Sequence, residues 1–179
     1  MIKGYVWFFT MVLCLRVEAQ HLLIDKASRI SFFSEAPLEN ISAITEKAAS
    51  AIDTSSGEVA YKVAIKTFAF KKQLMQEHFN ENYMESDRFP HATFTGKISE
   101  VINWGQDGIY PVSVTGILAI HGVRKRYTTT ATVTVKGESV TATAKFKVRV
   151  ADHRIKIPRI VIKNIAEVVE VDVFATYRK

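Results

Sequence analysis

The five histidines are the first residues in this sequence that invite a chemical role, because imidazole serves as a metal ligand and as a general base. None of them forms a close pair such as HExxH, and only one cysteine, Cys14, is present. Glu77-His78 and Asp152-His153 are acid–histidine neighbours. Successive residues of an extended chain point to opposite faces, so the two side chains of such a pair are poorly placed to act on the same group. We therefore expect solvated or capping histidines, with neither a metal site nor a catalytic histidine.

Nucleophilic and phosphate chemistry lack their usual motifs as well. No serine lies in a G-x-S-x-G turn, and the sequence has no glycine-rich phosphate loop. The net charge of +6 over 179 residues is a mild basic excess, which does not by itself point to nucleic acid. The basic runs at 124–126 and 145–149 favour the wet face of a sheet, although they would also suit anionic lipid headgroups. We predict a protein that is not an enzyme and binds no nucleic acid.

The N-terminal segment has the layout of a secretory signal peptide. Lys3 precedes an apolar run over residues 4–15, which is too short to cross a bilayer comfortably. Val17 and Ala19 then place short side chains at positions −3 and −1 of a cleavage site before Gln20. We predict a signal peptide over 1–19 and a periplasmic or secreted domain over 20–179. The alternative is an N-terminal helix that is buried or that anchors the chain in a membrane.

The C-terminal half alternates between apolar and polar residues. Over 127–135 one parity carries Val133 and Val135, and the other carries only threonines. After the turn at Lys136-Gly137-Glu138 the alternation resumes over 140–150. Period-two alternation on both sides of a short glycine turn predicts a hairpin of half-buried strands.

Similar alternation recurs over 59–65, 92–98, 110–120 and 169–177, so many strands joined by short turns indicate an antiparallel barrel or sandwich. Two segments depart from this pattern. Residues 41–52 carry apolar side chains at near-helical spacing, but their strand-like neighbours favour a strand arm over a helix. Residues 72–84 read as a short helix, which in a barrel would cap an open end.

Three segments together resemble a known family. Residues 70–98 read FKKQLMQEHFNENYMESDRFPHATFTGKI, residues 146–166 contain DHRIKIP, and residues 116–122 read GILAIHG. They resemble the YceI-like family of exported lipid-binding proteins, in its short form. The resemblance implies an all-β, eight-stranded antiparallel, lipocalin-like barrel with a short capping helix near residues 71–84. It also implies a bound polyisoprenoid, such as a quinone or prenyl alcohol. The segment 34–52 departs from the longer form of the family, which leaves the length of the cavity and of the ligand open.

The inward rows mix aromatic side chains with small residues such as Ala92, Gly96 and Gly116, which leaves room for a ligand or merely fits the taper of a filled barrel. With the resemblance, we expect a cavity for an extended apolar lipid, and no cofactor other than an isoprenoid or another long-chain lipid. The alternative is a filled-core barrel that acts as a protein-interaction or structural module. If the cavity binds a lipid, we also expect transient contact with a membrane surface.

The expected ligand-binding side chains come from the inward rows and from the helix. From the strands and their connections we expect Phe32, Tyr61, Val63, Phe68, Phe70, Phe94, Leu118, Ile120, Phe146 and Val148. From the helix we expect Leu74, Met75, Phe79 and Tyr83 at the capped end. We expect Phe79 to act as a lid residue that adds modestly to stability, and Phe146 to behave as a core residue.

Overall fold

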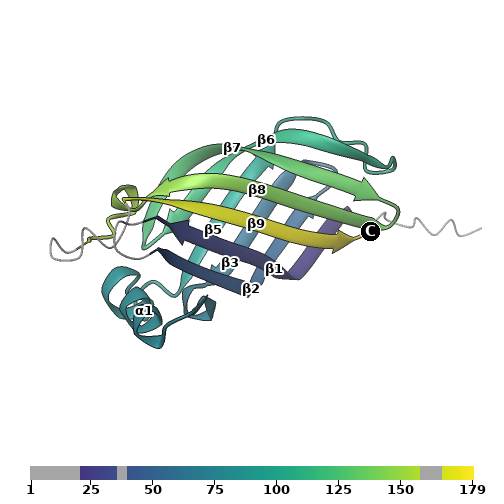
Figure 1. The fold of residues 1–179 in the computed structure, drawn as a ribbon. Helices are drawn as coiled ribbons and strands as arrows, with labels where there is room; N and C mark the ends of the chain where they lie inside the picture. The colour runs from purple at the N-terminus through teal and green to yellow at the C-terminus, as the bar shows by residue number, and fades with distance from the viewer. Residues whose placement is uncertain (1–20, 36–39, 158–166) are drawn as a thin grey trace, which may run out of the picture.

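A computed structural model describes residues 21–35, 40–157 and 167–179, and the predicted signal peptide lies outside these ranges. Eight strands pair antiparallel in the order β1-β9-β8-β7-β6-β5-β3-β2, and the pairing of β1 with β2 closes the barrel (Figure 1). The strands are β1 (Leu22–Ser34), β2 (Ile41–Asp53), β3 (Glu58–Ala64), β5 (His91–Ile98), β6 (Gly108–Ile120), β7 (Val123–Lys136), β8 (Ser139–Arg149) and β9 (Val168–Arg178). A two-residue strand, β4 (Ala69–Phe70), adds to β2. The predicted eight-stranded antiparallel barrel is confirmed.

The predicted register of the β7–β8 hairpin is confirmed. Val133 and Val140 are buried, whereas Thr128 and Thr130 are exposed on the outer face. Gly137 has φ +54° in the turn, a left-handed conformation that suits glycine. Because a slip of one residue would exchange the two faces, the alternation alone fixes this register.

Residues 41–52 form strand β2, as favoured, and their helical appearance comes from a bulge together with apolar residues on the outer face. Ala43 and Thr45 point inward, Glu46 and Lys47 are both exposed, and inward burial resumes at Ala48. The pairing with β1 shifts register at the same level. The extra residue changes the parity of the inward positions, and Ile44 and Ala51 add apolar side chains on the outer face, so the spacing resembles that of a helix.

The predicted helix lies within residues 71–84. It consists of α1 (Gln73–His78), followed directly by a π-helical turn, η2 (Phe79–Tyr83). The 3₁₀ turns η1 (Ile65–Thr67) and η3 (Val150–His153) complete the helical elements of the described ranges. In Figure 1, α1 lies outside the barrel, at the end where β1 and β8 finish and β9 begins. We call this the helix end. No helix in the described part of the chain is long and apolar enough to span a membrane.

The larger of two buried core clusters lies at the end opposite the helix. We call this the filled end, and it carries the β2–β3 and β7–β8 turns and the end of β9. Its core cluster consists of Leu23, Ile52, Val59, Ile98, Ile102, Val112, Val114, Val133, Val135, Val140, Ala142, Ala175 and Tyr177. A second, smaller buried cluster of Ala43, Ala48, Val63 and Phe68 lies toward the helix end. Core packing is therefore concentrated in one half of the barrel.

Candidate functional site

The barrel encloses a cavity of about 570 Å³ toward the helix end. All fourteen residues that the sequence predicts as ligand-binding lie on its wall. They come from β1, β3, β5, β6, β8 and the segment 68–83. The filled-core alternative predicts no continuous internal void, and this cavity contradicts it. That these side chains bind a ligand stays a prediction.

The wall also contains residues that the prediction omitted. Val169, Val171 and Val173 continue the inward row of β9, so the same alternation would have found them. Met84 ends the predicted helix and is absent from the expected ligand-binding residues, whereas Ile155 lies in an irregular segment without a period to follow. Further lining residues are Ile30, Ile41, Tyr127, Thr129, Ala131, Ala144 and Ile157.

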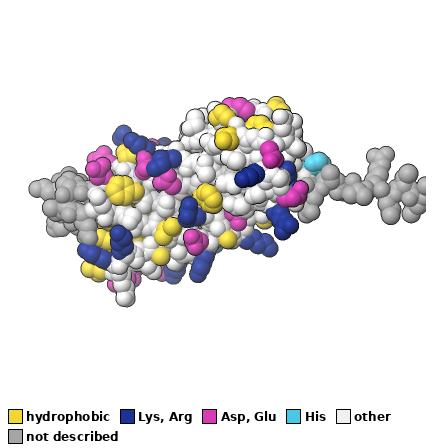
Figure 2. All heavy atoms as spheres, turned by 45° about the vertical axis from the view of Figure 1, so that its right-hand side comes forward, with side chains coloured by type: hydrophobic (Ala, Val, Ile, Leu, Met, Phe, Trp, Pro, Cys, Tyr) yellow, Lys and Arg dark blue, Asp and Glu magenta, His cyan; other side chains and the backbone are white. Residues whose placement is uncertain are grey.

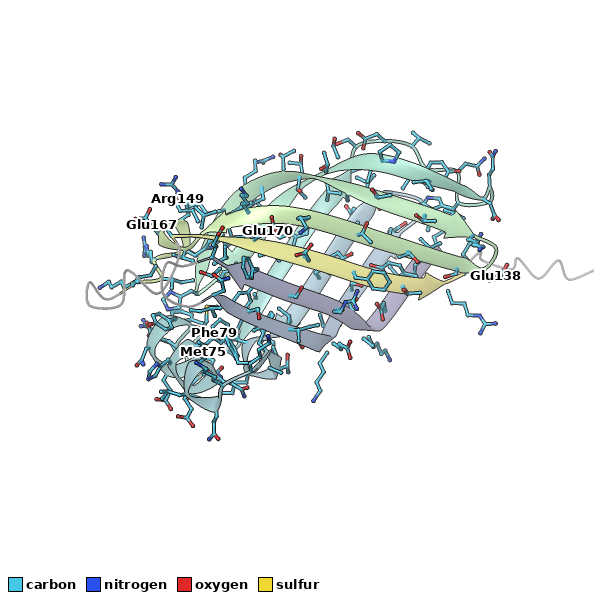
Figure 3. The ribbon with its side chains drawn as sticks, viewed as in Figure 1. Met75, Phe79, Glu138, Arg149, Glu167 and Glu170 are labelled. Atoms are coloured by element: carbon cyan, nitrogen blue, oxygen red, sulfur yellow. The ribbon has the colours of Figure 1, made fainter. Side chains whose placement is uncertain are left out.

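Four phenylalanine rings pack together at the helix end. Phe79 stacks on Phe32 with ring centroids 5.4 Å apart, and its centroid lies 5.0 Å from that of Phe70 and 5.9 Å from that of Phe68. No residue of the described helix α1 is buried, and the side chain of Leu74 is 60% exposed. Figure 3 shows Met75 and Phe79 on this helical segment, whereas Glu138 marks the opposite, filled end. The ring cluster therefore attaches the helical segment to the barrel.

The floor of the cavity contains two aromatic rings from neighbouring strands. Seven residues of the core cluster also line the cavity there: Ile52, Val59, Ile98, Val112, Val114, Val133 and Ala142. Tyr61 of β3 and Phe94 of β5 are register partners, line the cavity and also pack against the core of the filled end. The hydroxyl of Tyr61 lies 3.1 Å from that of Tyr177, which lies 2.8 Å from the hydroxyl of Ser50. Burial raises the pKa of both tyrosines, so both remain neutral hydroxyls.

This chain of hydroxyls continues to the barrel surface. Ser50 contacts Ser28 at 2.7 Å, and the Ser28 hydroxyl donates to the Asp25 carboxylate at 2.8 Å. Asp25 also accepts from the backbone N–H groups of Ala27 and Thr176. Each buried hydroxyl therefore has a partner, which is the condition for placing polar groups in a core at little cost. The chain holds the Tyr61 ring in one position on the floor.

His153 contradicts the expectation of solvated histidines, because it is completely buried. Its Nδ1 lies 3.2 Å from the Val123 carbonyl oxygen and its Nε2 lies 3.1 Å from the Tyr127 hydroxyl. A carbonyl only accepts, so Nδ1 carries the hydrogen and Nε2 accepts from Tyr127. Burial lowers the pKa of His153 and favours this neutral form. Since Tyr127 lines the cavity, His153 supports the wall at the helix end.

A second histidine ties η3 to the helical segment. His121, in the β6–β7 turn, contacts the His153 carbonyl oxygen through Nδ1 at 3.2 Å and the Glu85 carboxylate through Nε2 at 3.1 Å. The ring of Phe89 packs on it with centroids 4.5 Å apart. In the described ranges, no three His, Cys, Asp or Glu side chains gather closely enough to hold a metal ion.

The outer face of the barrel mixes both charge signs. Lys145 Nζ lies 2.7 Å from the Glu170 carboxylate and 3.1 Å from that of Asp172. Figure 2 shows basic and acidic side chains interspersed over one face of the molecule, with single hydrophobic side chains between them. These pairs favour the interpretation of the basic run in β8 as the wet face of the sheet.

The sequence model of the YceI-like domain matches residues 23–177 of this chain. A polyisoprenoid binding domain from Saccharophagus degradans, implicated in plant cell wall breakdown, is 17% identical, with a TM-score of 0.76 over 88% of this chain and 98% of that one. BcnA from Burkholderia cenocepacia is 17% identical, with a TM-score of 0.73 over 86% and 98%. The YCEI protein from Campylobacter jejuni is 13% identical, with a TM-score of 0.58 over 99% of both chains. No curated protein shows detectable sequence similarity to this chain.

Proposed function

The chain belongs to the YceI-like family, and we propose that it binds an extended apolar lipid of the polyisoprenoid type inside its barrel cavity. The observation that carries this proposal is the cavity itself, about 570 Å³ with a wall of mainly aliphatic and aromatic side chains. Sites for small ligands typically measure about 300–1,000 Å³ and are lined in this way. The Saccharophagus degradans domain, which has the same fold, is named for binding polyisoprenoids.

Affinity in such a site comes from removing hydrocarbon from water. Each Å² of buried apolar surface contributes about 25 cal/mol before the costs of association. The lining side chains with polar groups include Ser34, Lys72 and His78, which come from the helix end of β1 and from the helical segment. The hydrocarbon tail therefore lies toward the floor, and the polar head of the lipid lies toward the helix end.

The protein acts as a carrier or binder rather than an enzyme, and it works outside the cytoplasm. Binding alone requires only the apolar wall, so no reacting group is assigned to any lining residue. The layout of residues 1–19 supports export to the periplasm or the medium. Transient contact with a membrane surface would allow the lipid to enter and leave.

A matched pair of variants tests whether the lipid occupies the cavity. Ala131 points into the cavity, whereas Thr130, its neighbour in β7, is exposed on the outer face. Ala131→Phe places a ring in the cavity, and Thr130→Phe adds the same ring outside. With geranylgeraniol as the probe, we expect Ala131→Phe to weaken equilibrium binding at least about tenfold, a loss of about 1.4 kcal/mol. Thr130→Phe keeps the wild-type affinity.

Thermal melts of both variants show whether each is folded before binding is compared. Equal affinity of folded Ala131→Phe and wild-type protein would place the lipid outside the cavity and contradict the proposal.

A further inference from the structure

Two glycines face each other on the inner side of the barrel wall. Gly96 of β5 and Gly116 of β6 are register partners, and neither has a positive φ, so backbone conformation does not require glycine at these positions. Close contacts on the inner side require it instead. A Cβ on Gly96 would lie 2.7 Å from the Thr115 carbonyl oxygen and 2.8 Å from the Phe94 ring. A Cβ on Gly116 would overlap the Thr95 carbonyl oxygen and lie 2.5 Å from the same ring. The Phe94 ring therefore rests on the two glycines.

Its contact with the two glycines directs the Phe94 side chain along the wall toward the filled end. Phe94 belongs to the inward row of β5, in which Gly96 and then Ile98 follow toward that end. The ring occupies the layer that a side chain at Gly96 or Gly116 would otherwise fill. It packs on the core of the filled end on one side and faces the cavity on the other. The next inward pair, Ile98 and Val114, also lines the cavity, so the ring narrows the cavity just above its end.

Tyr61 completes the floor beside Phe94, and its hydroxyl is already bonded to Tyr177. The floor therefore presents ring carbon to the cavity, which suits the apolar end of a hydrocarbon chain. We propose that Phe94, seated on the Gly96–Gly116 pair, is the stop that sets how much of a polyisoprenoid chain the cavity can bury. This inference rests on the proposed function, and it assigns to Phe94 the preference of the protein for the length of the polyisoprenoid chain.

The experiment measures affinity against chain length. Geraniol, farnesol, geranylgeraniol and geranylfarnesol differ by one isoprene unit each, so binding tightens with every unit that is buried and levels off when the cavity is full. Phe94→Ala removes the stop and opens up to one two-residue layer, about 6.8 Å along an antiparallel strand. We expect the affinity of this variant to level off one isoprene unit later, with about tenfold tighter binding of that longer alcohol than of the next shorter one.

Phe146→Ala is the matched control. Phe146 lies on the side wall of the cavity in β8 and is absent from the core of the filled end. The same truncation there widens the cavity without deepening it. We expect weaker binding of every alcohol, with levelling off at the wild-type length.

The outcomes separate the two proposals. Wild-type protein that binds none of the four alcohols would overturn the proposed function. Wild-type protein that binds them, with levelling off at the same length in Phe94→Ala, would overturn only the role of Phe94. Thermal melts establish that each variant is folded. If Phe94→Ala does not fold, Phe94→Leu keeps an apolar side chain and shortens the stop, and an unchanged length preference in that variant also refutes the inference.

Discussion

Replacing Phe79 by alanine tests how the helical segment is held against the barrel. The segment either covers the cavity with little effect on stability, or is held by ring packing that contributes to stability. Phe79 contacts the rings of Phe32, Phe68 and Phe70, with centroid distances of 5.0–5.9 Å. Each such pair is worth about 0.5–1.5 kcal/mol beyond the burial of its area. Truncation of a fully buried phenylalanine costs about 3–5 kcal/mol, and Phe79 is only half-buried.

We therefore expect Phe79→Ala to lower the free energy of unfolding of lipid-free protein by about 2–3 kcal/mol. For a chain of this size that is a drop in Tm of roughly 4–12 °C. Phe146→Ala is the comparison, because Phe146 has one ring contact, to Tyr127 at 6.3 Å, and otherwise faces the cavity. Its loss costs less, about 1–2 kcal/mol.

The assay combines thermal melts of lipid-free protein with the rate at which bound geranylgeraniol is lost. Phe79→Ala is expected to melt first and to release the lipid faster, because it loses the ring contacts of the helical segment with Phe32, Phe68 and Phe70. If Phe79→Ala melts with the wild type while Phe146→Ala melts early, the ring cluster does not hold the segment, and the reasoning from these contacts is wrong.

Two further predictions concern His153 and the N-terminus. Because burial lowers the pKa of His153 below its usual 6.5, below pH 6.5 the unfolded chain binds a proton that the folded protein does not. Stability is therefore expected to fall as the pH drops from about 7.5 to about 5, and His153→Gln is expected to lose less over that interval in thermal melts. An equal loss in both proteins would show that His153 remains uncoupled from folding. Export by the native host is expected to yield a mature N-terminus within two residues of Gln20, and N-terminal sequencing that finds Met1 on the exported product would refute the signal peptide.

The strands and their inner faces could be predicted because alternation has a physical cause at each residue. In β7, Val133 and Val135 are buried in the core whereas Thr128 and Thr130, on the other parity, are exposed, as their residue types indicate. The bulge in β2 shows where this reasoning weakens. Exposed Glu46 and Lys47 in succession reverse the parity, and Ile44 and Ala51 add apolar side chains on the outer face, so the apolar positions mimic a helix until the pairing with β1 is known.

How far the cavity reaches into the barrel could not be predicted from the sequence. Phe146, in a strand of clear alternation, is expected from the sequence both to line the cavity and to behave as a core residue; it lines the cavity and belongs to neither buried core cluster. That Phe79 acts as a lid residue stays a prediction, and its packing on three other rings could not be predicted from the sequence. Alternation indicates that a side chain points into the barrel. Whether it contacts packed side chains or the cavity depends on strands that are distant in the sequence. The burial of His153 depends in the same way on Tyr127 and Val123.

Native mass spectrometry of gently purified protein tests most directly whether the cavity holds a lipid. The account predicts a population heavier than the polypeptide by the mass of a long-chain lipid, which dissociates on collisional activation and is absent from Ala131→Phe. Protein at the polypeptide mass alone, which also takes up no added prenyl alcohol, would contradict the account.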